Sequence, residues 1–474
     1  MALPSSSIRV FNTLTREKEV FVPLEPGKVR IYTCGPTVYD YAHIGNFRAF
    51  VFEDLLKRWL KFRGFSVIHV MNLTDVDDKT IKGSRVHGIP FKEYTDYYAK
   101  AFFEDAAALN IEPADVYPRA TEHIAEMVML IRKLLAKGFA YKGEDGSVYF
   151  AIRKFSEYGK LSKIQFLELK AGSRVNVDEY AKEEAQDFAL WKAWTPVDGD
   201  VFWETELGRG RPGWHIECSA MSTKYLGDTF DIHCGGVDNM FPHHENEIAQ
   251  SEAATGKQFV RYWMHNEHLL VEGKRMAKRL GNFYTLRDLF KKGYNPMAIR
   301  YLLLSTHYRQ QFNFTFEGLE AAQSAVGRFT NLMRRLQDTN GNESKGRVAE
   351  LIAKVENCFG AAMDDDLNVS AAFAFLFGFV REINNLLDEN SVNKQEAGHI
   401  FELLTRIDSV LGVAGEVKKE KALPKEAQEL LVKREEARKS RDWKTADLLR
   451  QQLKAMGVVI EDTAQGVRWR KETA

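Results

Sequence analysis

The first 120 residues alternate short apolar runs with stretches of helical periodicity. The runs "KVRIYTC" at 28–34 and "SVIHVMNLTD" at 66–75 have the length of buried strands. Between them, residues 47–65 form an amphipathic helical pattern that Gly64 closes. A strand, a helix and a strand at this spacing make a βαβ unit, which predicts a parallel sheet.

This alternation breaks between residues 121 and 210 and then resumes. Short tyrosine-rich strands, such as those in "GSVYFAIRKFSEYG" at 146–159, replace it there. The α/β pattern returns in "DTFDIHCGGVDNMFPHHENEIAQ" at 228–250. We therefore expect one sheet whose two halves are separated by an insertion.

After about residue 285 the pattern is helical. Residues 367–387 have helical spacing. We expect Asp364, Asp365 and Asp366 to lie at the N-terminus of that helix, where the helix dipole favours negative charge. The longest apolar stretch, at 371–380, is too short to span a bilayer and predicts a buried helix.

Composition adds only broad limits to this pattern. The 474 residues suffice for about three domains, and 66 basic and 66 acidic residues balance, so the net charge indicates no class of partner. The N-terminus lacks a basic segment followed by an apolar run, so we expect a cytoplasmic protein with no membrane partner. Four cysteines in so long a chain do not make a disulfide framework.

Local charge is more informative at the C-terminus. Residues 418–474 hold 15 Lys and Arg against 10 Asp and Glu, and Trp443 lies among them. Phosphate attraction and base stacking make such a module compatible with nucleic acid, although a basic helical face is more often simply solvated.

The stretch "FPHHENEIAQ" at 241–250 is a candidate metal site. Proline before helix-forming residues predicts a helix start, which places His243 and Glu247 on one helix face. Position 248 is isoleucine, so the stretch is not the H-E-x-x-H pattern of a metalloprotease. His243 and Glu247 could therefore supply two ligands of a metal site that needs further ligands from elsewhere. Alternatively, the two side chains only cap the helix or lie on its solvent-exposed face.

Cysteines could complete this half-site. In a reducing compartment, cysteines near histidines are more often metal ligands or nucleophiles than disulfide partners. Cys34, Cys218 and Cys234 have glycine-rich or histidine-rich surroundings, whereas Cys358 falls in an apolar helical pattern and is expected in the core. Cys234, followed by two glycines, could equally be a small packing residue.

A second candidate site follows the first predicted strand, in "TCGPTVYDYAHIGNFRAF" at 33–50. A strand that feeds a helix N-terminus in a βαβ fold binds phosphates, because unpaired backbone N–H groups point outward there. His43 stands at the helix start, and Gly45 allows a ligand close to the backbone. The four letters "HIGN" would also fit a helix start without a ligand.

Longer motifs decide between these interpretations. "HIGN" resembles the HIGH element of class I aminoacyl-tRNA synthetases, and "RMAKRLGN" at 275–282 resembles their KMSKS loop. The stretches "YTCGPTVYDYAHIG", "NLTDVDDK", "RPGWHIECSAM", "DIHCGGVDNMFPHHENEIAQ" and "YWMH" resemble the cysteinyl-tRNA synthetase family. The inserted "GSVYFAIRKFSEYGKLS", the helical "MDDDLNVSAAFAFLFGF" and the terminal "ARKSRDWKTADLLRQQL" are similar too, so the resemblance covers essentially the whole chain in order.

The resemblance implies an α/β fold with a defined order of domains. A Rossmann-like parallel-sheet catalytic domain with an inserted connective domain is followed by an α-helical bundle and a small mixed C-terminal domain. The expected ranges are 1–120 and 211–265 for the two catalytic halves, 121–210 for the connective domain, 266–320 for the KMSKS loop and stem-contact region, 321–417 for the bundle and 418–474 for the anticodon-binding domain.

The resemblance also implies a site for the metal and the amino acid. One zinc ion per subunit is expected on Cys34, Cys218, His243 and Glu247. Thiolate, imidazole and carboxylate in one set suit zinc. Cys234 and His244 are left for packing or for contacts behind the ligands. The expected cysteine-binding residues are Cys34, Gly35, Thr37, Trp214 and His233.

For the nucleotide, the resemblance implies positioning and charge stabilisation rather than covalent chemistry. The expected ATP-binding residues are His43, Gly45, Asn46, Asp238, Arg275 and Lys278, of which His43 and Lys278 are catalytic. The chain departs from the family pattern at Asn46 in HIGH and at Arg275, Ala277 and Arg279 in KMSKS. Lys278 is kept, so activity is expected, while the departures leave ATP affinity and loop kinetics undetermined.

The implied reaction activates L-cysteine with ATP and Mg²⁺ and transfers it from cysteinyl-adenylate to the 3′ end of tRNA(Cys). Zinc would bind the thiolate of cysteine and so reject serine, which shape alone rejects only about a hundredfold. No hydrolytic editing domain is therefore expected.

The resemblance also implies how tRNA is recognised. Arg438, Trp443 and Asp447 match anticodon-reading residues and are expected on one helix. The protein is expected to be a monomer.

Two other functions are compatible with the residues. A cysteine ligase of the same ancestry would pass the adenylate to a small amine, but it would not need the C-terminal module. A non-catalytic zinc protein or an RNA-binding regulator could use the same scaffold, but the complete zinc set and Lys278 argue against it.

Overall fold

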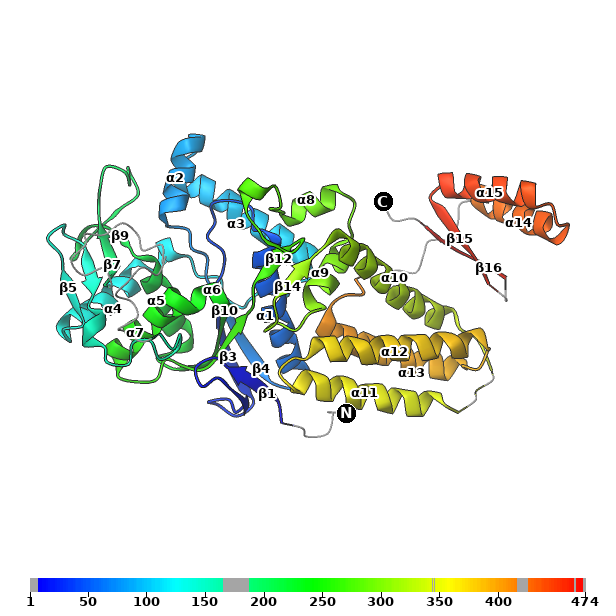
Figure 1. Ribbon diagram of the computed structural model, residues 1–474, viewed down its shortest axis with the longest axis horizontal. Helices are drawn as coiled ribbons and strands as arrows, with labels where there is room; N and C mark the ends of the chain where they lie inside the picture. The colour runs from blue at the N-terminus through cyan, green and yellow to red at the C-terminus, as the bar shows by residue number, and fades with distance from the viewer. Residues whose placement is uncertain are drawn as a thin grey trace.

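The computed structural model describes residues 7–164, 187–342, 344, 346–415, 425–463 and 466–471 (Figure 1). Its central element is a parallel sheet of four strands in the order β11-β10-β3-β4. The strands are β3 (Lys28–Thr33), β4 (Ser66–Met71), β10 (Phe230–Gly236) and β11 (Val260–Asn266). The expectation of one parallel sheet interrupted by an insertion is confirmed.

The two halves of this sheet join through β3 and β10, whose pairing aligns Ile31 with Ile232. Helix α1 (Ile44–Phe62) connects β3 to β4, and α7 (Glu245–Thr255) lies between β10 and β11. The strand order therefore runs outward in opposite directions from the β3–β10 pair. In open parallel sheets, ligands bind beyond the carboxyl ends of the strands where the order reverses in this way.

Helix α1 begins three residues before the predicted 47–65 because His43 caps it. His43 Nδ1 accepts the Asn46 N–H at 3.2 Å, and Asn46 Oδ1 accepts the His43 N–H at 3.1 Å. This reciprocal capping box satisfies two backbone donors that a helix start leaves free. The fully buried Trp59 anchors the other end of α1 in the main hydrophobic core.

The insertion forms an antiparallel sheet of its own, in the order β5-β6-β7-β9-β8. It lies at the opposite end of the molecule from the helical bundle (Figure 1). Its elements are α4 (Ile124–Ala136), β5 (Ala140–Lys142), β6 (Val148–Phe150), β7 (Phe188–Ala193), β8 (Trp203–Thr205) and β9 (Gly208–Pro212). Helix α5 (Trp214–Leu226) then returns the chain to β10.

Smaller elements complete the catalytic part. The N-terminal hairpin, the helices after β4 and the short helical turns are β1 (Arg9–Asn12), β2 (Glu17–Val20), α2 (Asp78–His87), α3 (Phe91–Ala108), η1 (Ala120–Glu122), η2 (Ile152–Lys154), α6 (Val237–Asn239) and η4 (Met240–His244). A three-stranded sheet and two helices follow β11, namely β12 (Leu269–Val271), β13 (Lys274–Arg275), η5 (Lys278–Leu280), α8 (Leu286–Lys291), α9 (Pro296–Leu304) and β14 (Phe312–Phe314).

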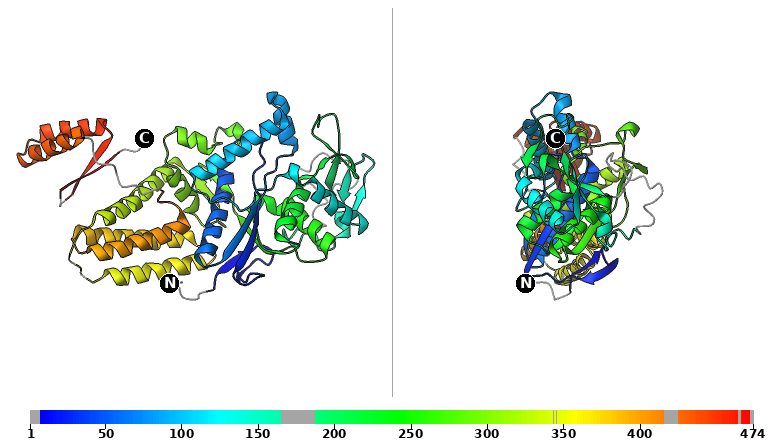
Figure 2. Two further views of the ribbon diagram at one scale, coloured as in Figure 1. Left: turned by 180° about the vertical axis from the view of Figure 1, so that it is seen from behind. Right: turned by 90° about the vertical axis from the view of Figure 1, so that its left-hand side faces the viewer.

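Four long helices form the bundle. They are α10 (Phe316–Asp338), α11 (Val348–Asp364), α12 (Val369–Asp388) and α13 (Lys394–Leu411). Seen from behind, the bundle, the parallel sheet and the insertion follow one another along the long axis (Figure 2). Helix α12 buries one face only, since Phe375 is exposed, so the prediction of a buried helix at 371–380 holds for that face alone.

The prediction that the three aspartates start α12 is wrong. Asp364 is the last residue of α11, and Asn368 caps α12. Asp366 instead joins the bundle to the catalytic part, because its buried carboxylate accepts the Tyr308 hydroxyl at 2.6 Å and pairs with Arg309 Nε at 2.7 Å. Long-range partners, which no local pattern shows, decide the place of this acidic run.

A second buried ionic contact ties α1 to the bundle. The Asp54 carboxylate of α1 lies 2.8 Å from Arg58 Nε and 2.5 Å from Arg300 Nη2 of α9. Arg300 Nε also donates to the Leu411 carbonyl at the end of α13, at 2.7 Å. The helix that carries His43 is thus held against both the catalytic core and the bundle.

The C-terminal unit has a small core of its own around Leu453 and Val458. Its elements are α14 (Lys425–Lys439), α15 (Trp443–Ala455), β15 (Val458–Thr463) and β16 (Gly466–Lys471). It projects beyond the bundle in Figure 1. Within the described ranges of the whole chain, no helix is both long enough and apolar enough to cross a membrane.

Candidate functional site

A cleft of about 550 Å³ opens at the carboxyl ends of β3 and β10, where the strand order reverses. The residue after β3, the start of α1 and the loop after β11 contribute to its walls. Among the expected site residues, those that line it are Cys34, Gly35, Thr37, His43, Gly45, Asn46, Trp214, Cys218, Asp238, His243 and Arg275. Glu247, His233 and Lys278 do not line it.

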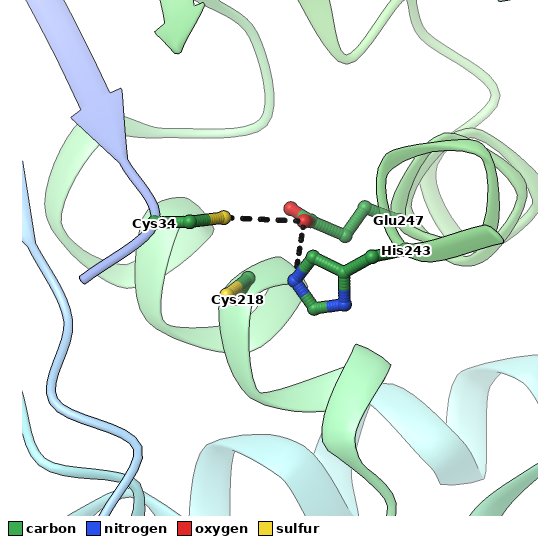
Figure 3. Close-up of side chains that lie close together, drawn as sticks. All are labelled: Cys34, Cys218, His243 and Glu247. Carbon is green, nitrogen blue, oxygen red and sulfur yellow. Dashed lines mark hydrogen bonds and ion pairs between the residues drawn. The ribbon is translucent and has the colours of Figure 1, made fainter. Parts of the chain in front are cut away.

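Four expected metal ligands converge at the deep end of the cleft (Figure 3). One donor atom from each of Cys34, Cys218, His243 and Glu247 lies within 4.8 Å of the other three. Cys34 directly follows β3, Cys218 lies on α5, and the other two residues come from η4 and α7. The site therefore needs both halves of the sheet and the helix that ends the insertion.

His243 and Glu247 face each other as the spacing predicts, with Nε2 and Oε1 3.1 Å apart. The helical turn η4, in which Phe241 alone has extended backbone angles, carries His243 and His244 and leads directly into α7 at Glu245. Behind the pair, His243 Nδ1 lies 2.8 Å from His215 Nδ1, and the Trp214 ring stacks on the imidazole with centroids 4.1 Å apart. These contacts hold the imidazole with Nε2 toward the other three donors.

The Nε2 atom of His243 is the best test of a metal in this group. It is buried and lies 3.1 Å from Glu247 Oε1 as an ion pair, but it makes no well-oriented hydrogen bond, so a metal bond would satisfy it. Two sulfurs, one imidazole nitrogen and one carboxylate oxygen are the donors and the number that Zn²⁺ takes in tetrahedral sites. The residues present therefore fit a zinc ion.

The charges of this group are strongly coupled. Burial lowers the pKa of His243, but Glu247 and Cys218 raise it to about 10. Burial raises the pKa of Glu247, but His233 and His243 lower it to about 2. Burial also raises the pKa of Cys218, but Cys34 and the charge of His243 bring it to about 6. Without metal, a proton on His243 balances the two anions, so a metal ion would bind by displacing that proton.

A second group of donors overlaps the first and was missed in the sequence. Donor atoms of Cys34, His233, His244 and Glu247 also lie within 4.8 Å of one another. His244 Nε2 is 3.3 Å from Cys34 Sγ, and its Nδ1 is 2.8 Å from His265 Nε2. Neither His233 nor His244 lines the cleft, whereas Cys218 and His243 do. The residues peculiar to the first group therefore face the cleft, whereas those peculiar to the second lie behind it.

The remaining residues of this end are small or aromatic. A Cβ on Gly35 would stand 1.7 Å from the Asn72 carbonyl oxygen, so no other residue fits there without movement of the backbone. Thr37 forms a β-bridge with Thr74 beside the cleft. Cys234 is fully buried in the main core, outside both donor groups found among the described residues. His233 Nε2 supports Glu247 Oε2 from behind, at 3.0 Å.

The N-terminus of α1 forms another part of the cleft wall. Burial lowers the pKa of His43 to about 4, so the imidazole is neutral at pH 7. Because Nδ1 accepts the Asn46 N–H, the proton of the neutral ring is on Nε2. A Cβ on Gly45 would stand 2.9 Å from His43 Nδ1, so this position keeps the helix end accessible. The arrangement suits an anion at a helix N-terminus.

The rim of the cleft carries exposed charges. Asp238 lies 3.3 Å from His268 Nδ1, and Arg275 lines the cleft nearby. Lys278 points elsewhere: its Nζ pairs with Asp40 Oδ2 at 2.6 Å, and 65% of its side chain is exposed. It must leave Asp40 to reach a ligand in the cleft.

The prediction of one helix for Arg438, Trp443 and Asp447 is wrong. Arg438 lies near the end of α14, whereas α15 carries the other two. Asp442 caps α15 by accepting the Thr445 N–H at 3.1 Å, a signal that "RDWKT" carries. Trp443 is 59% exposed.

Three family profiles match most of the chain. A family profile described as "tRNA synthetases class I (C) catalytic domain" matches residues 20–324. A profile of a "DALR domain" matches 358–415, and one of a "Cysteinyl-tRNA ligase anticodon binding domain" matches 420–470.

Curated relatives are similar over their full length. A "Cysteine--tRNA ligase" of Protochlamydia amoebophila is 50% identical over 474 residues, which are 99% of each chain. One of Chlamydia pneumoniae is 51% identical over 96% of each chain. Among solved structures, Mycobacterium tuberculosis methionyl-tRNA synthetase superposes with a TM-score of 0.60 at 14% identity, over 82% of this chain and 90% of that one, a likeness of fold.

Proposed function

This chain belongs to the cysteinyl-tRNA synthetase family, and on that premise we propose how its cleft divides the work of a cysteine–tRNA ligase. The deep end would select L-cysteine through zinc. The start of α1 and the charged rim would bind ATP. The convergence of four buried or half-buried donors, with His243 Nε2 turned toward the other three, supports the first assignment. The family membership favours this function over the small-amine ligase and over a non-catalytic scaffold.

At the deep end, Cys34, Cys218, His243 and Glu247 would hold one zinc ion per subunit. Zinc there would lower the pKa of the substrate thiol and bind it as a thiolate, which serine cannot offer. Gly35, Thr37 and Trp214 shape the space around the amino acid, and His233 keeps Glu247 oriented. An apolar pocket of the same shape would reject serine only about a hundredfold, so the donor set explains selection without an editing site.

At the α1 end, the neutral His43 offers an Nε2–H donor to the phosphates of ATP, beside Gly45 and the capping Asn46. Asp238 and Arg275 lie on the rim for the nucleoside and the phosphates. Mg²⁺ accompanies ATP and offsets its charge. Attack by the cysteine carboxylate on the α-phosphate then needs positioning and charge stabilisation, for which side chains form no covalent bond.

Lys278 is the main mobile cation of this scheme. It lies between Gly273 and Gly281, which both have positive φ, +73° and +66°. Turns at two glycines allow the segment to swing, so Lys278 can exchange the Asp40 carboxylate for phosphate oxygens. Charge supplied in this way matters most where negative charge develops in the transition state.

The C-terminal unit would read the anticodon of tRNA(Cys) through Arg438, Trp443 and Asp447. An exposed indole provides a stacking face for an unpaired base, and guanidinium and carboxylate groups provide polar contacts to base edges. We further propose that the enzyme works in the cytoplasm as a monomer.

Cobalt substitution tests the assignment of the deep end. With Co²⁺ in place of zinc, addition of L-cysteine should intensify a sulfur-to-metal absorption band because a further thiolate enters the coordination sphere. L-serine at the same concentration should leave the spectrum unchanged. A spectrum that ignores cysteine would make the metal structural and would refute this mode of selection.

A further inference from the structure

His268 is the one side chain of the described cleft wall that pairs with an expected ATP residue and was given no role. It lies between β11 and β12, and 42% of its side chain is exposed. Its Nδ1 faces Asp238 Oδ2 at 3.3 Å across the rim. The pair joins the loop after β11 to the turn after β10, so it spans one wall of the cleft.

Asp238 is suited to bind hydroxyl groups. Its carboxylate has two oxygens, of which Oδ2 faces His268, and 68% of the side chain is exposed to the cleft and solvent. A ribose offers vicinal hydroxyl donors that carboxylates in nucleotide-binding folds accept. An isolated carboxylate there would also repel the phosphates of the same ATP, and a cation beside it reduces that repulsion.

We propose that His268 is a positioning residue for ATP, which fixes the Asp238 carboxylate for the ribose hydroxyls and offsets its charge toward the phosphates. This inference rests on the proposed place of ATP in the cleft. The discrimination between ATP and its 2′-deoxy analogue, and the pH dependence of ATP binding, then depend on His268.

The charges around His268 give the direction of that dependence. The hydrogen bond to Asp238 raises the pKa of His268, Glu267 raises it further, and burial and Arg275 oppose them. On the other side, the hydrogen bond to His268 is the main cause of the lowered pKa of Asp238, with Arg275 and His43 acting the same way. Protonated His268 therefore predominates at low pH. As the pH rises through the raised pKa, Asp238 loses its counter-charge, and the KM for ATP should increase.

Cysteine-dependent ATP–pyrophosphate exchange, measured with full-length protein between pH 6 and 9, tests the inference. In His268→Gln, an uncharged donor should still face Asp238, so the KM for ATP should be about threefold above wild type at low pH and should converge with it at high pH. In His268→Leu, the KM should be raised at every pH, and the preference for ATP over 2′-deoxyATP should fall. The KM for cysteine should be unchanged in both variants.

Two controls keep the outcomes distinct. His399→Gln, an exposed histidine on α13, should match wild type throughout. If both His268 variants keep the wild-type pH profile and nucleotide preference while Lys278→Ala slows exchange, the inference about His268 is wrong and the proposed function stands. If Lys278→Ala also behaves as wild type, the place of ATP itself is wrong. An equal rise in the KM values for ATP and cysteine would show a purely structural role and overturn the inference.

Discussion

The two ends of the cleft are built on opposite principles. At the deep end, Glu247 is fully buried and is contacted by His233, His243 and His244. At the rim, Lys278 pairs with Asp40 and stays largely exposed. In the proposed function, the first end offers donors that are in place before the substrate binds, and the second offers a cation that has to move to reach ATP.

Under the proposed function, this difference follows from what each end would have to distinguish. A thiol and a hydroxyl differ in softness and acidity rather than in shape, so selection requires fixed donors and a dry pocket. ATP requires charge compensation that changes along the reaction, which a mobile cation supplies. Removal of one partner of a buried charge pair also costs about 3–5 kcal/mol of folding free energy, whereas an exposed ion pair contributes about 0–1 kcal/mol. The effects of substitution should therefore shrink from the deep end to the rim.

The largest effect is expected for His243→Ala. Removal of one member of a buried charged set costs about 3–5 kcal/mol, so kcat/KM for cysteine should fall at least about a hundredfold, with loss of bound zinc. Zinc content and exchange kinetics measure both. The matched neighbour His244→Ala should retain the metal, as should Cys234→Ala. Loss of zinc from His244→Ala alone would move the metal to the second donor group.

Lys278→Ala should have the next largest effect. It removes a charge used mainly in the transition state, so the rate of adenylate formation should fall about a hundredfold with little change in the KM for cysteine. Single-turnover adenylation measures this rate. Arg275→Lys keeps its charge and should change the rate only a few-fold. Equal damage from the two substitutions would contradict a special role for Lys278.

Trp443 lies outside both ends of the cleft, so Trp443→Ala provides a reference for the effects of the cleft substitutions. Loss of one stacked base costs about 1–3 kcal/mol, so aminoacylation of tRNA(Cys) should slow about tenfold or more. Pyrophosphate exchange, which needs no tRNA, should stay at the wild-type level. The same split should appear on removal of residues 418–474. A folded truncated protein without exchange activity would refute the separation of the C-terminal unit from the cleft.

The smallest effect is expected for Asp40→Asn. Its pair with Lys278 is exposed, so its loss should change the KM for ATP by about threefold or less. The direction should be a decrease, because Lys278 no longer has to leave a carboxylate. Initial rates at varied ATP and two salt concentrations provide the measurement, and salt should reduce the difference from wild type. A large loss of activity would show that Asp40 itself contacts a substrate.

Local patterns sufficed where adjacent residues decide the structure. The strands β3 and β4 fall within the predicted runs, and the four-residue spacing of His243 and Glu247 brings them into contact. The capping signal of Asp442 was also present, but the basic run around it was interpreted as one continuous helix. The single-helix prediction was therefore wrong although the sequence contained the capping signal that separates α14 from α15.

Other features depend on contacts between distant segments and leave no local pattern. Neither His244 nor His265 belongs to a local pattern that would pair them. Their ring nitrogens lie 2.8 Å apart only because η4 and β11 meet in the fold. Asp366 was assigned to a helix start by its charge, yet its partners Tyr308 and Arg309 lie 57 to 58 positions away. Lys278 could be recognised by its motif, but the place where it rests depends on Asp40, far earlier in the chain.

The pairing of β3 with β10 has a consequence for synthesis on the ribosome. Because the insertion lies between them, β3 emerges about 200 residues before its partner, roughly 10–40 s at ordinary elongation rates. During that interval one side of β3 is an unpaired strand edge, which is prone to pair with other chains. Cys34, at the end of that strand, is synthesised long before Cys218, His243 and Glu247. If the four donors hold zinc as proposed, a nascent chain should complete its metal site and lose its exposed edge at nearly the same moment, so zinc supply during translation would influence how much of the protein escapes aggregation.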